Sequence, residues 1–579
     1  MTIKVPILSE INVLIVLRAL GIESDKDLIN YIVYDDNDHD MIDVLRTSLD
    51  ECKNEKGLKI LTQEDALEYL MTKMRVIKKY SETDKNVRQQ QKRLHLKTLL
   101  ETGFIPHVEN DMMQKAVYIC YMLNKLLRCS IGRIPKDDRD SYVNKRIDLP
   151  GSLIEELFRQ FYRKMINDCN KFFKKRNPND EDPINIINQI KPNVIEQGLK
   201  TALLTGSWIR RKGVAQMLQR LTFLYTMSSL RRIDAPGGDA ATNKLTGPRH
   251  LHPSSVRWLC CVSTPEHSKV GLTKHLSLIG TVSILQTSQL ALIKSFLKKK
   301  LTNIQDIAAH KLKNQTKVFL NGEWLGLTSE PFVLDAELRQ NKLNGNFDPT
   351  VSIVNDIMER ELKVYCDGGR GYAPAICVEN NVIKLTKEHL KAISLDRSKT
   401  DKITSWDEFM IKYPGVVEYI DMEEQPFLLF ADKIATVEDM RKQMISSIDK
   451  VKFVKSNKNE NRYDDMMFVR YTHCEFHPAF LIAEIVSTIP FCNSNQGPRN
   501  IFFYSQGRQA MGIYISNYRD RLDISYILYH PQRPLVMTRT SKYTYADILP
   551  SGENVIVAIA CYTGLILAHV ISKNMASPS

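Results

Sequence analysis

The sequence predicts an α+β fold divided among several domains. With 579 residues the chain is too long for one compact core, and at roughly 100 to 200 residues per domain it should form about three to six units. Helix-like and strand-like segments are mixed without a regular β-α alternation, which argues against a single α/β sheet. A composition of 43% hydrophobic and 25% charged residues excludes a disordered or fibrous chain.

Two amphipathic helices are predicted in the first half of the chain. Pro150 and Gly151 interrupt the preceding segment, and Ser152 with Glu155 has the spacing of a capping box. The second helix is predicted over residues 214–225 from its apolar spacing. The apolar positions are Leu153, Leu157, Phe161 and Met165 in the first helix, and Val214, Met217, Leu218, Leu221, Leu224 and Tyr225 in the second.

Strands are predicted further along the chain. Residues 318–327 contain an Asn321-Gly322 pair, which is a strong signal for a tight hairpin turn. Residues 363–378 have strand character and should bend at the Asp-Gly-Gly sequence 367–369. The polar run 455–462 is interpreted as a loop or linker.

The apolar run 555–571 requires a membrane test, because it is long and uncharged enough to be a marginal transmembrane candidate. Gly564 and His569 interrupt it, however. We therefore interpret residues 555–562 as a buried strand and expect no membrane association.

The chain is basic and rich in scattered cysteines. Lys and Arg number 80 against 67 Asp and Glu, giving a net charge of +13 and a pI near 9.0, which favours a polyanionic partner. The 11 cysteines include no C-x-x-C pair, as expected of reduced thiols rather than a disulfide or zinc-ribbon framework. The apolar run 11–17 is too short for a signal peptide and no cleavage site follows it. We expect an intracellular protein.

The basic residues are concentrated between positions 200 and 257. Ten Lys and Arg residues there face only Asp234 and Asp239. Arginine suits phosphate because its planar guanidinium donates paired hydrogen bonds, and Gly237-Gly238 would let the backbone approach a ligand. The alternative is a solvated basic surface, which is the commoner meaning of a charge run.

Motifs for metal-dependent or nucleophilic catalysis are weak. Tyr-Asp-Asp occurs at 34–36 and 463–465, and that triplet holds Mg²⁺ in single-chain reverse transcriptases, but three residues carry little information and Asp464 follows a polar loop. No G-x-x-x-x-G-K-[ST] or G-x-G-x-x-G phosphate loop is present, and no Ser-His-Asp set can be assembled.

His473, Cys474 and His477 have a spacing typical of metal ligands. A structural zinc needs four ligands, however, and no second pair lies nearby. Pro478 would also end any helix that aligned the two histidines. We therefore interpret this cluster as structural.

Nine segments carry a family resemblance when they are taken in order. They are VLIVLRALGIESD from Val13, DDRDSYVNKRIDLPGSL from Asp137, GLKTALLTGSW from Gly198, SSLRRIDAP from Ser228, GPRHLHPSSVRWLCCVSTPEHSKVGLTKHLSLIG from Gly247, THCEFHPAFLIAEIVSTIPFCNSNQGPRN from Thr472, GRQAMGIYISNY from Gly507, ILYHPQRPL from Ile527 and VIVAIACYTG from Val555. Together they resemble the second-largest (beta-like) subunit of multisubunit DNA-directed RNA polymerases, most closely the RNA polymerase II type. Nine collinear matches are highly specific.

The resemblance implies a domain order. The expected parts are a lobe (1–125), a returning segment of the protrusion (126–190), a fork (191–275), external domain 1 (276–365), external domain 2 (366–455), the beginning of the hybrid-binding domain (456–564) and a divergent tail (565–579).

The resemblance also implies site residues. Arg499 matches the arginine that faces the phosphates of the incoming nucleotide, and residues 236–244 would form a fork loop. Positions that match residues near the template, the RNA–DNA hybrid or the edge of the active centre are Arg231, Arg232, Arg249, Glu266, Arg508 and Gln509. Arginine contacts to phosphate do not depend on base sequence, as transcription of arbitrary templates requires.

Two departures from the family pattern indicate a divergent lineage, such as that of large DNA viruses. The E-T-P-E-G motif is replaced by residues 263–267 (STPEH), and Gly497 replaces the serine of NQSPRN. After Gly564 the family's Y-N-Q-E-D-S does not follow, so we expect a partial chain.

These observations predict part of a polymerase subunit that helps to bind template, hybrid and nucleotide during RNA synthesis. The resemblance implies Mg²⁺ held mainly by the largest subunit, with no complete catalytic set, no metal ligand and no zinc in this chain. The expected partners are the largest and smaller subunits, DNA template, RNA–DNA hybrid and ribonucleoside triphosphates. The location would be the nucleus for a cellular form, and the host cytoplasm or virion for a viral one. The alternative is a non-catalytic nucleic-acid-binding fragment or one piece of a split subunit, and the isolated chain is expected to be inactive.

Overall fold

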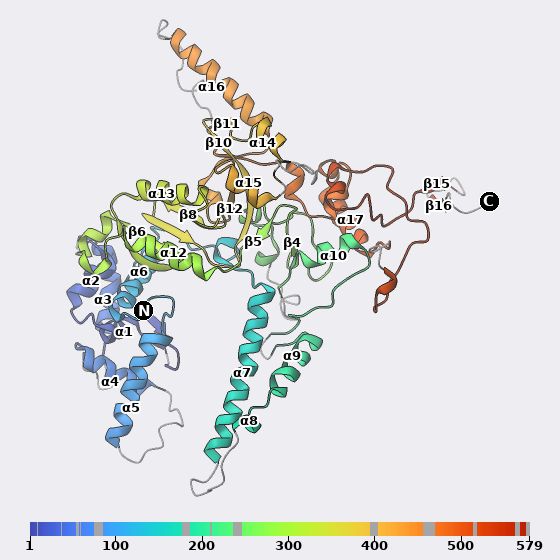
Figure 1. Cartoon of the computed structure of the whole chain (residues 1–579). Helices are drawn as coiled ribbons and strands as arrows, with labels where there is room; N and C mark the ends of the chain where they lie inside the picture. The colour runs from blue at the N-terminus through green and yellow to red at the C-terminus, as the bar shows by residue number, and fades with distance from the viewer. Residues whose placement is uncertain are drawn as a thin grey trace. The chain divides into compact units, whose positions relative to one another are not determined.

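The chain forms two compact units, each built from two separate stretches of sequence (Figure 1). The first unit comprises residues 1–138 and 286–367, and the second comprises 139–285 and 368–579. The computed structural model describes residues 1–8, 10–35, 37–53, 57, 59–74, 85–175, 186–208, 211–235, 246–307, 309–393, 403, 405–454, 469–512, 518–561 and 568–574. Both units mix helices and strands, so the predicted multidomain α+β class is confirmed.

The N-terminal part of the first unit is helical. Every residue of helix α1 is buried, and all of them except Arg18 are apolar. The helix begins where the Asn12 side chain accepts a hydrogen bond from the backbone of Leu14 at 3.0 Å. The short strands β1 (Thr2–Lys4) and β2 (Glu10–Asn12) pair before it. The helices are α1 (Val13–Leu20), α2 (Asp25–Val33), α3 (His39–Asp50), α4 (Gln63–Lys73), α5 (Lys85–Thr98) and α6 (Met112–Ser130).

A four-stranded sheet completes the first unit, in the order β7-β6-β9-β8. The predicted hairpin is confirmed, since Asn321 and Gly322 both have positive φ angles at its turn. Glu361 on β9 is fully buried. Its carboxylate accepts a hydrogen bond from the hydroxyl of Tyr121 on α6 and lies 2.9 Å from the ammonium of Lys125. The elements are β6 (Thr316–Leu320), β7 (Glu323–Thr328), β8 (Ser352–Asp356), β9 (Glu361–Tyr365), α12 (Thr287–Lys298) and α13 (Pro331–Leu343).

The second unit is organised around strand β10, which pairs with β5, β11, β12 and β14, while β13 runs parallel to β14. The bend predicted at 367–369 lies between β9 and β10. The strands are β3 (Arg232–Ile233), β4 (Lys274–His275), β5 (Thr281–Val282), β10 (Gly371–Glu379), β11 (Val382–Ile383), β12 (Val417–Asp421), β13 (Phe430–Ala431), β14 (His473–Cys474), β15 (Val555–Cys561) and β16 (Ala568–Asn574). The helices are α7 (Pro150–Lys175), α8 (Ile186–Gln189), α9 (Asn193–Thr205), α10 (Phe223–Leu230), α14 (Lys387–Ala392), α15 (Trp406–Lys412), α16 (Ile434–Val454) and α17 (Gly497–Gln509).

The first predicted helix is confirmed as α7, which packs along α9 (Figure 1). Gly198 on α9 is required there, because a Cβ atom at this position would lie 2.4 Å from the Phe161 ring. The predicted capping box is wrong in detail. The helix already begins at Pro150, a residue favoured in the first turn, and the Ser152 hydroxyl donates to the carbonyl of Leu149 instead.

The second predicted helix is wrong over most of its length, because only α10 is helical. Gly213 has a φ angle of +73°, residues 214–222 are irregular, and the Thr222 hydroxyl caps α10 by accepting from the backbone of Tyr225 at 3.1 Å. Met217 is 84% exposed. Of the predicted apolar positions, Val214, Met217 and Leu218 line a cavity, and only Leu224 and Tyr225 belong to a helix.

The strand predicted at 555–562 is present as β15, which pairs with β16. Its predicted burial is wrong at the start, since Val555, Ile556 and Val557 are each about half exposed. Within the described ranges, no helix combines the length and apolar character needed to cross a bilayer. The predicted loop at 455–462 lies outside the described residues.

A buried ion pair joins the segment before β4 to the central sheet. The guanidinium of Arg257 pairs with the carboxylate of Glu475, lies 4.2 Å from the ring centroid of Phe430, and donates to the carbonyl of Pro374 at 3.0 Å. Arg257 and Glu475 are only about 5% exposed. Removing one partner would leave the other charge buried and unpaired.

We expect Arg257→Met to lower the free energy of opening of the second unit by roughly 3–5 kcal/mol, the usual cost of breaking a buried pair from one side. Hydrogen exchange of the amides of β10 and β14 would measure it. As a control, Arg159→Met removes an exposed ion pair with Glu155 on α7 and should cost less than about 1 kcal/mol. Equal effects of the two substitutions would contradict the role of Arg257.

Candidate nucleic-acid interface

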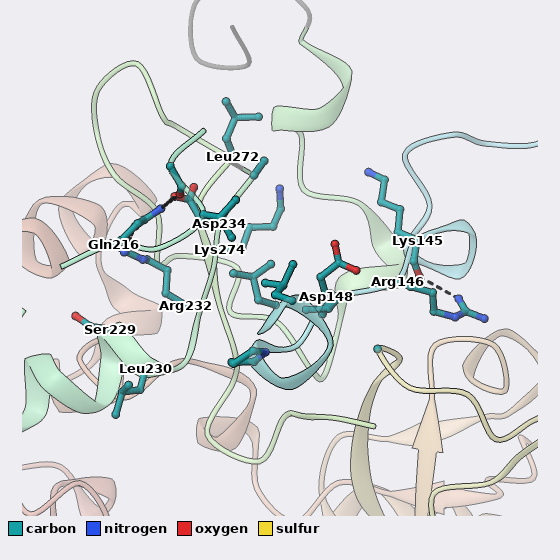
Figure 2. Close-up of a pocket in the computed structure, with 18 of the residues that line it drawn as sticks. Lys145, Arg146, Asp148, Gln216, Ser229, Leu230, Arg232, Asp234, Leu272 and Lys274 are labelled. Carbon is teal, nitrogen blue, oxygen red and sulfur yellow. Dashed lines mark hydrogen bonds between the residues drawn. The ribbon is translucent and has the colours of Figure 1, made fainter. Parts of the chain in front are cut away.

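A cavity of about 680 Å³ lies within the second unit, between the segment that leads into α7 and the strands β3 and β4 (Figure 2). The lining is mostly apolar, and its charged residues are mainly basic. The charged residues around it are Lys145, Arg146, Arg211, Arg232 and Lys274, against Asp148 and Asp234. Several lining residues come from the basic window 200–257, whereas Lys145, Arg146 and Lys274 lie outside it.

A hydrogen-bonded chain organises one side of the cavity. Arg232 donates to the side-chain oxygen of Gln216 at 2.5 Å, and the Gln216 amide donates to Asp234 at 2.8 Å (Figure 2). Burial tends to raise the pKa of Asp234, but hydrogen bonds from Gln216 and Thr273, together with the charges of Lys269 and Arg232, outweigh it, so the pKa is lowered and the carboxylate stays ionised. The ionised Asp234 carboxylate holds the Gln216 amide, and the neutral Gln216 side chain in turn orients the Arg232 guanidinium.

Two ammonium groups lie close to one aromatic ring near the cavity. The Nζ atoms of Lys145 and Lys274 lie 5.2 Å and 5.9 Å from the ring centroid of Tyr142. Burial and the neighbouring charge of Lys145 lower the pKa of Lys274. The carboxylate of Asp140 lies 3.8 Å from Nζ of Lys145 and partly offsets these charges, and Lys274 also donates to the carbonyl of Pro248 at 3.2 Å. The charged lining of the cavity still holds five basic residues against two acidic ones.

His275 links β4 to helix α17. Its Nδ1 faces the carbonyl of Ser263 at 3.3 Å and must carry a proton, so Nε2 accepts from the Tyr504 hydroxyl at 2.8 Å. Burial, together with the nearby charges of Arg232 and Arg508, lowers the pKa of His275 to about 4. The imidazole is therefore neutral at physiological pH.

The structure brings two predicted site residues together around this contact. Arg508 stacks on Tyr504, with its guanidinium carbon 4.9 Å from the ring centroid, and both Arg232 and Arg508 act electrostatically on His275. Arg508 and Gln509 occupy the C-terminal end of α17. The second unit thus places a residue from the basic window beside one from the far end of the sequence.

Arg231 and Arg249 use their guanidinium groups inside the protein. Arg231 pairs with buried Glu484 and donates to the carbonyls of Ser277, Leu278 and Gly280, the last at 3.0 Å. Arg249 donates to the carbonyls of Ser268 and Val270 at 2.7 Å and 2.9 Å. Both arginines therefore organise the backbone beside the cavity.

The remaining predicted site residues are separate from the cavity. Glu266 is half-buried in the loop that Arg249 holds. Arg499 is exposed near the start of α17, 5.6 Å from the ring of Phe502, and is about 13 Å along the helix from Arg508. The predicted fork loop at 236–244 lies outside the described residues.

Sequence reasoning did not single out Lys145, Arg146, Lys274, His275 or Tyr504. All except Tyr504 lie inside the segments that carry the family resemblance. Membership of those segments was the only sequence signal that could have pointed to them. Their common position depends on long-range packing, which local patterns do not encode.

The metal-like motifs separate in the fold. His473 is buried in β14, whereas His477 is exposed and accepts from the backbone of Ala479 at 3.1 Å. Asp35, from the first Tyr-Asp-Asp triplet, pairs with Lys313 at 2.6 Å, and the second triplet lies outside the described residues.

Across the described residues, one group of three ligand-type side chains is spaced for a metal ion, namely Cys377, Glu418 and His473. A thiol and an imidazole do not suit Mg²⁺, which prefers oxygen ligands. This group therefore does not fit the expected catalytic Mg²⁺.

Five sequence families match successive parts of the chain. In chain order they are described as RNA polymerase Rpb2 domain 2 (residues 1–148), domain 3 (216–282), domain 4 (318–379), domain 5 (406–478) and domain 6 (485–574).

Curated relatives match almost the whole chain. DNA-directed RNA polymerase subunit 2 of Acanthamoeba polyphaga mimivirus is 42% identical over 97% of this chain and 47% of its own length. DNA-directed RNA polymerase II subunit 2 of Arabidopsis thaliana and subunit RPB2 of Schizosaccharomyces pombe are each 35% identical over 98% of this chain, and over 45% and 47% of their own lengths. The chain spans about half the length of the curated relatives it matches.

The neutral, buried His275 predicts a pH dependence of stability. Its pKa in the folded protein is about 4, below the unfolded value of 6.5, so the unfolded chain binds the extra proton between these values. Its contribution is present above pH 6.5 and is lost as the pH falls toward 4, by roughly 3 kcal/mol in total. Thermal melts of His275→Gln should show a shallower loss of stability between pH 6.5 and 4 than the unsubstituted chain. Parallel pH profiles would contradict the assignment.

Proposed function

Because the chain belongs to the family of second-largest subunits of multisubunit DNA-directed RNA polymerases, we propose that it binds template DNA and the RNA–DNA hybrid within an assembled transcribing enzyme. The complex would catalyse template-directed nucleotidyl transfer. This chain would supply phosphate-binding surface, and the largest subunit would mainly hold the catalytic Mg²⁺.

The observation that carries the nucleic-acid proposal is the excess of basic over acidic side chains around the cavity, five against two, with the ammonium groups of Lys145 and Lys274 both near the ring of Tyr142. Nucleic-acid phosphates would balance this excess positive charge, and binding would release counterions. Arg232 adds a bidentate donor on the same cavity. These contacts go to the backbone of the nucleic acid, so they would hold any base sequence.

We assign different roles to the predicted site residues. Arg232 and Arg508 would contact the hybrid directly, with Gln509 beside them. Arg231 and Arg249 would position the fork-like segment, because their guanidinium groups already bond protein carbonyls. Glu266 would lie at the edge of the active centre.

Arg499 would contact the phosphates of the incoming nucleotide. Its side chain is exposed on α17, and a permanently charged planar donor suits a triphosphate. The proposed separation of tasks along α17 places nucleotide binding near its start and hybrid binding near its end.

The proposed partners are the largest subunit, the smaller subunits, template, hybrid and ribonucleoside triphosphates. The proposed location is intracellular, in the nucleus for a cellular form and in the host cytoplasm or virion for a viral one. The isolated chain is expected to show no primer extension, since the catalytic Mg²⁺ would be held elsewhere.

Arg232→Ala should weaken binding of a labelled RNA–DNA hybrid by a similar factor for unrelated sequences and reduce the salt slope of log K by about one. Fluorescence anisotropy at several salt concentrations would measure both quantities. Lys442→Ala, which removes an exposed charge on α16, is the matched control and should leave the slope unchanged. If the two variants behave alike, Arg232 does not contact the hybrid.

Arg499→Ala, introduced into a reconstituted complete complex, should raise the apparent KM for nucleotide while sparing promoter binding. A lost charge-assisted contact to phosphate corresponds to about 1.5–3 kcal/mol, or roughly 10- to 100-fold. Steady-state elongation kinetics would measure the KM, with Lys442→Ala again as control. Unchanged nucleotide kinetics would remove Arg499 from this role.

A further inference from the structure

Three strands of the second unit bring a cysteine, a glutamate and a histidine together. Cys377 on β10 lies opposite His473 on β14, and Glu418 on β12 lies opposite Ala375, two residues from Cys377 on β10. Opposed residues of antiparallel strands project to the same face, so these three side chains share one face of the sheet. All three are buried, and their ligand atoms lie within 4.8 Å of one another.

The chemistry of this set matches a zinc-class ion. Thiolate, imidazole and carboxylate are the three usual protein ligands of Zn²⁺, and three protein ligands with one open position is an established arrangement. With metal–ligand distances of about 2.0–2.3 Å, neighbouring ligand atoms would lie about 3.3–3.8 Å apart. Nε2 of His473 and the nearer oxygen of Glu418 are already 3.2 Å apart. Small side-chain rotations would bring the sulfur within the same range.

The imidazole of His473 is held in the orientation that a metal ligand requires. The Thr472 hydroxyl lies 3.0 Å from both the carbonyl of Leu429 and Nδ1 of His473. This contact holds the ring with Nε2 directed at the Glu418 carboxylate, 3.2 Å away. The ring also stacks on Phe430, with centroids 5.5 Å apart.

Either a proton on Nε2 or a bound cation makes the close approach of Nε2 to the Glu418 carboxylate favourable. A proton on Nε2 would give a hydrogen bond from the imidazole to the carboxylate. A cation accounts in addition for the cysteine sulfur on the same face. The three-residue set is therefore better explained by a metal than by a hydrogen bond alone.

We propose that Cys377, Glu418 and His473 bind one zinc-class divalent cation with its fourth position open to water. Binding displaces the thiol proton of Cys377 to solvent and leaves the ring proton of His473 on Nδ1, which donates to the Thr472 hydroxyl. The thiolate, the carboxylate and Nε2 then each donate a lone pair to the ion. The ion joins β10, β12 and β14. This inference departs from the expectation, drawn from the sequence, that the chain binds no zinc.

The test uses the full 579-residue chain after removal of metals with a chelator. Competition with a chromophoric zinc indicator should show one tightly bound Zn²⁺ per chain, and Co²⁺ should give a thiolate-to-cobalt charge-transfer band. Cys377→Ser should abolish the band and weaken Zn²⁺ binding by roughly 100-fold or more. Cys474→Ala alters the cysteine that follows His473, on the opposite face of β14, and should retain both the Zn²⁺ binding and the cobalt band.

Folding is checked by circular dichroism and by thermal melts in the presence of chelator. Should Cys377→Ser fail to fold, Glu418→Gln and the Co²⁺ spectrum of the unsubstituted chain decide the matter. Zinc binding that survives in both Cys377→Ser and Glu418→Gln, or a cobalt complex without a thiolate band, would overturn the proposal.

Discussion

The buried ion pair between Arg257 and Glu475 is the constraint on which the second unit depends. It joins the segment that leads to β4 with the segment that follows β14, and the ring of Phe430 and the carbonyl of Pro374 complete the surroundings of the guanidinium. Burying two charges is favourable only when geometry and further hydrogen bonds compensate for lost hydration. The pair therefore ties the segment before β4 to the central sheet through β10 and the residue after β14.

The partners of their guanidinium groups divide the arginines of the basic window into two groups. Arg231, Arg249 and Arg257 are bonded to protein carbonyls or carboxylates and stabilise the backbone. Arg232 instead lines the cavity, where its contact to Gln216 is to a neutral oxygen. Net charge alone cannot distinguish these roles, because a guanidinium bonded to protein carbonyls contributes the same formal charge as one that binds phosphate.

The contact between His275 and Tyr504 explains how two cationic segments can lie close together. A protonated imidazole between Arg232 and Arg508 would add a third positive charge, but burial and those two charges keep His275 neutral. The neutral ring then accepts from Tyr504 and fastens α17 to β4. Arg232 and Arg508 therefore lie near a neutral imidazole and not near a third positive charge.

The sequence by itself determined the fold class, the family, helix α7 and the hairpin at Asn321-Gly322, because each rests on local periodicity, turn chemistry or a collinear match. It predicted a helix at 214–225 that the structure lacks, since apolar spacing does not reveal whether a segment packs on a core or lines a cavity. Only the tertiary structure decided which arginines face inward, placed Lys145 and Lys274 near the ring of Tyr142, and brought Cys377, Glu418 and His473 onto one face. Those arrangements join residues tens to more than a hundred positions apart, and their energies depend on burial and on partners that no local pattern contains.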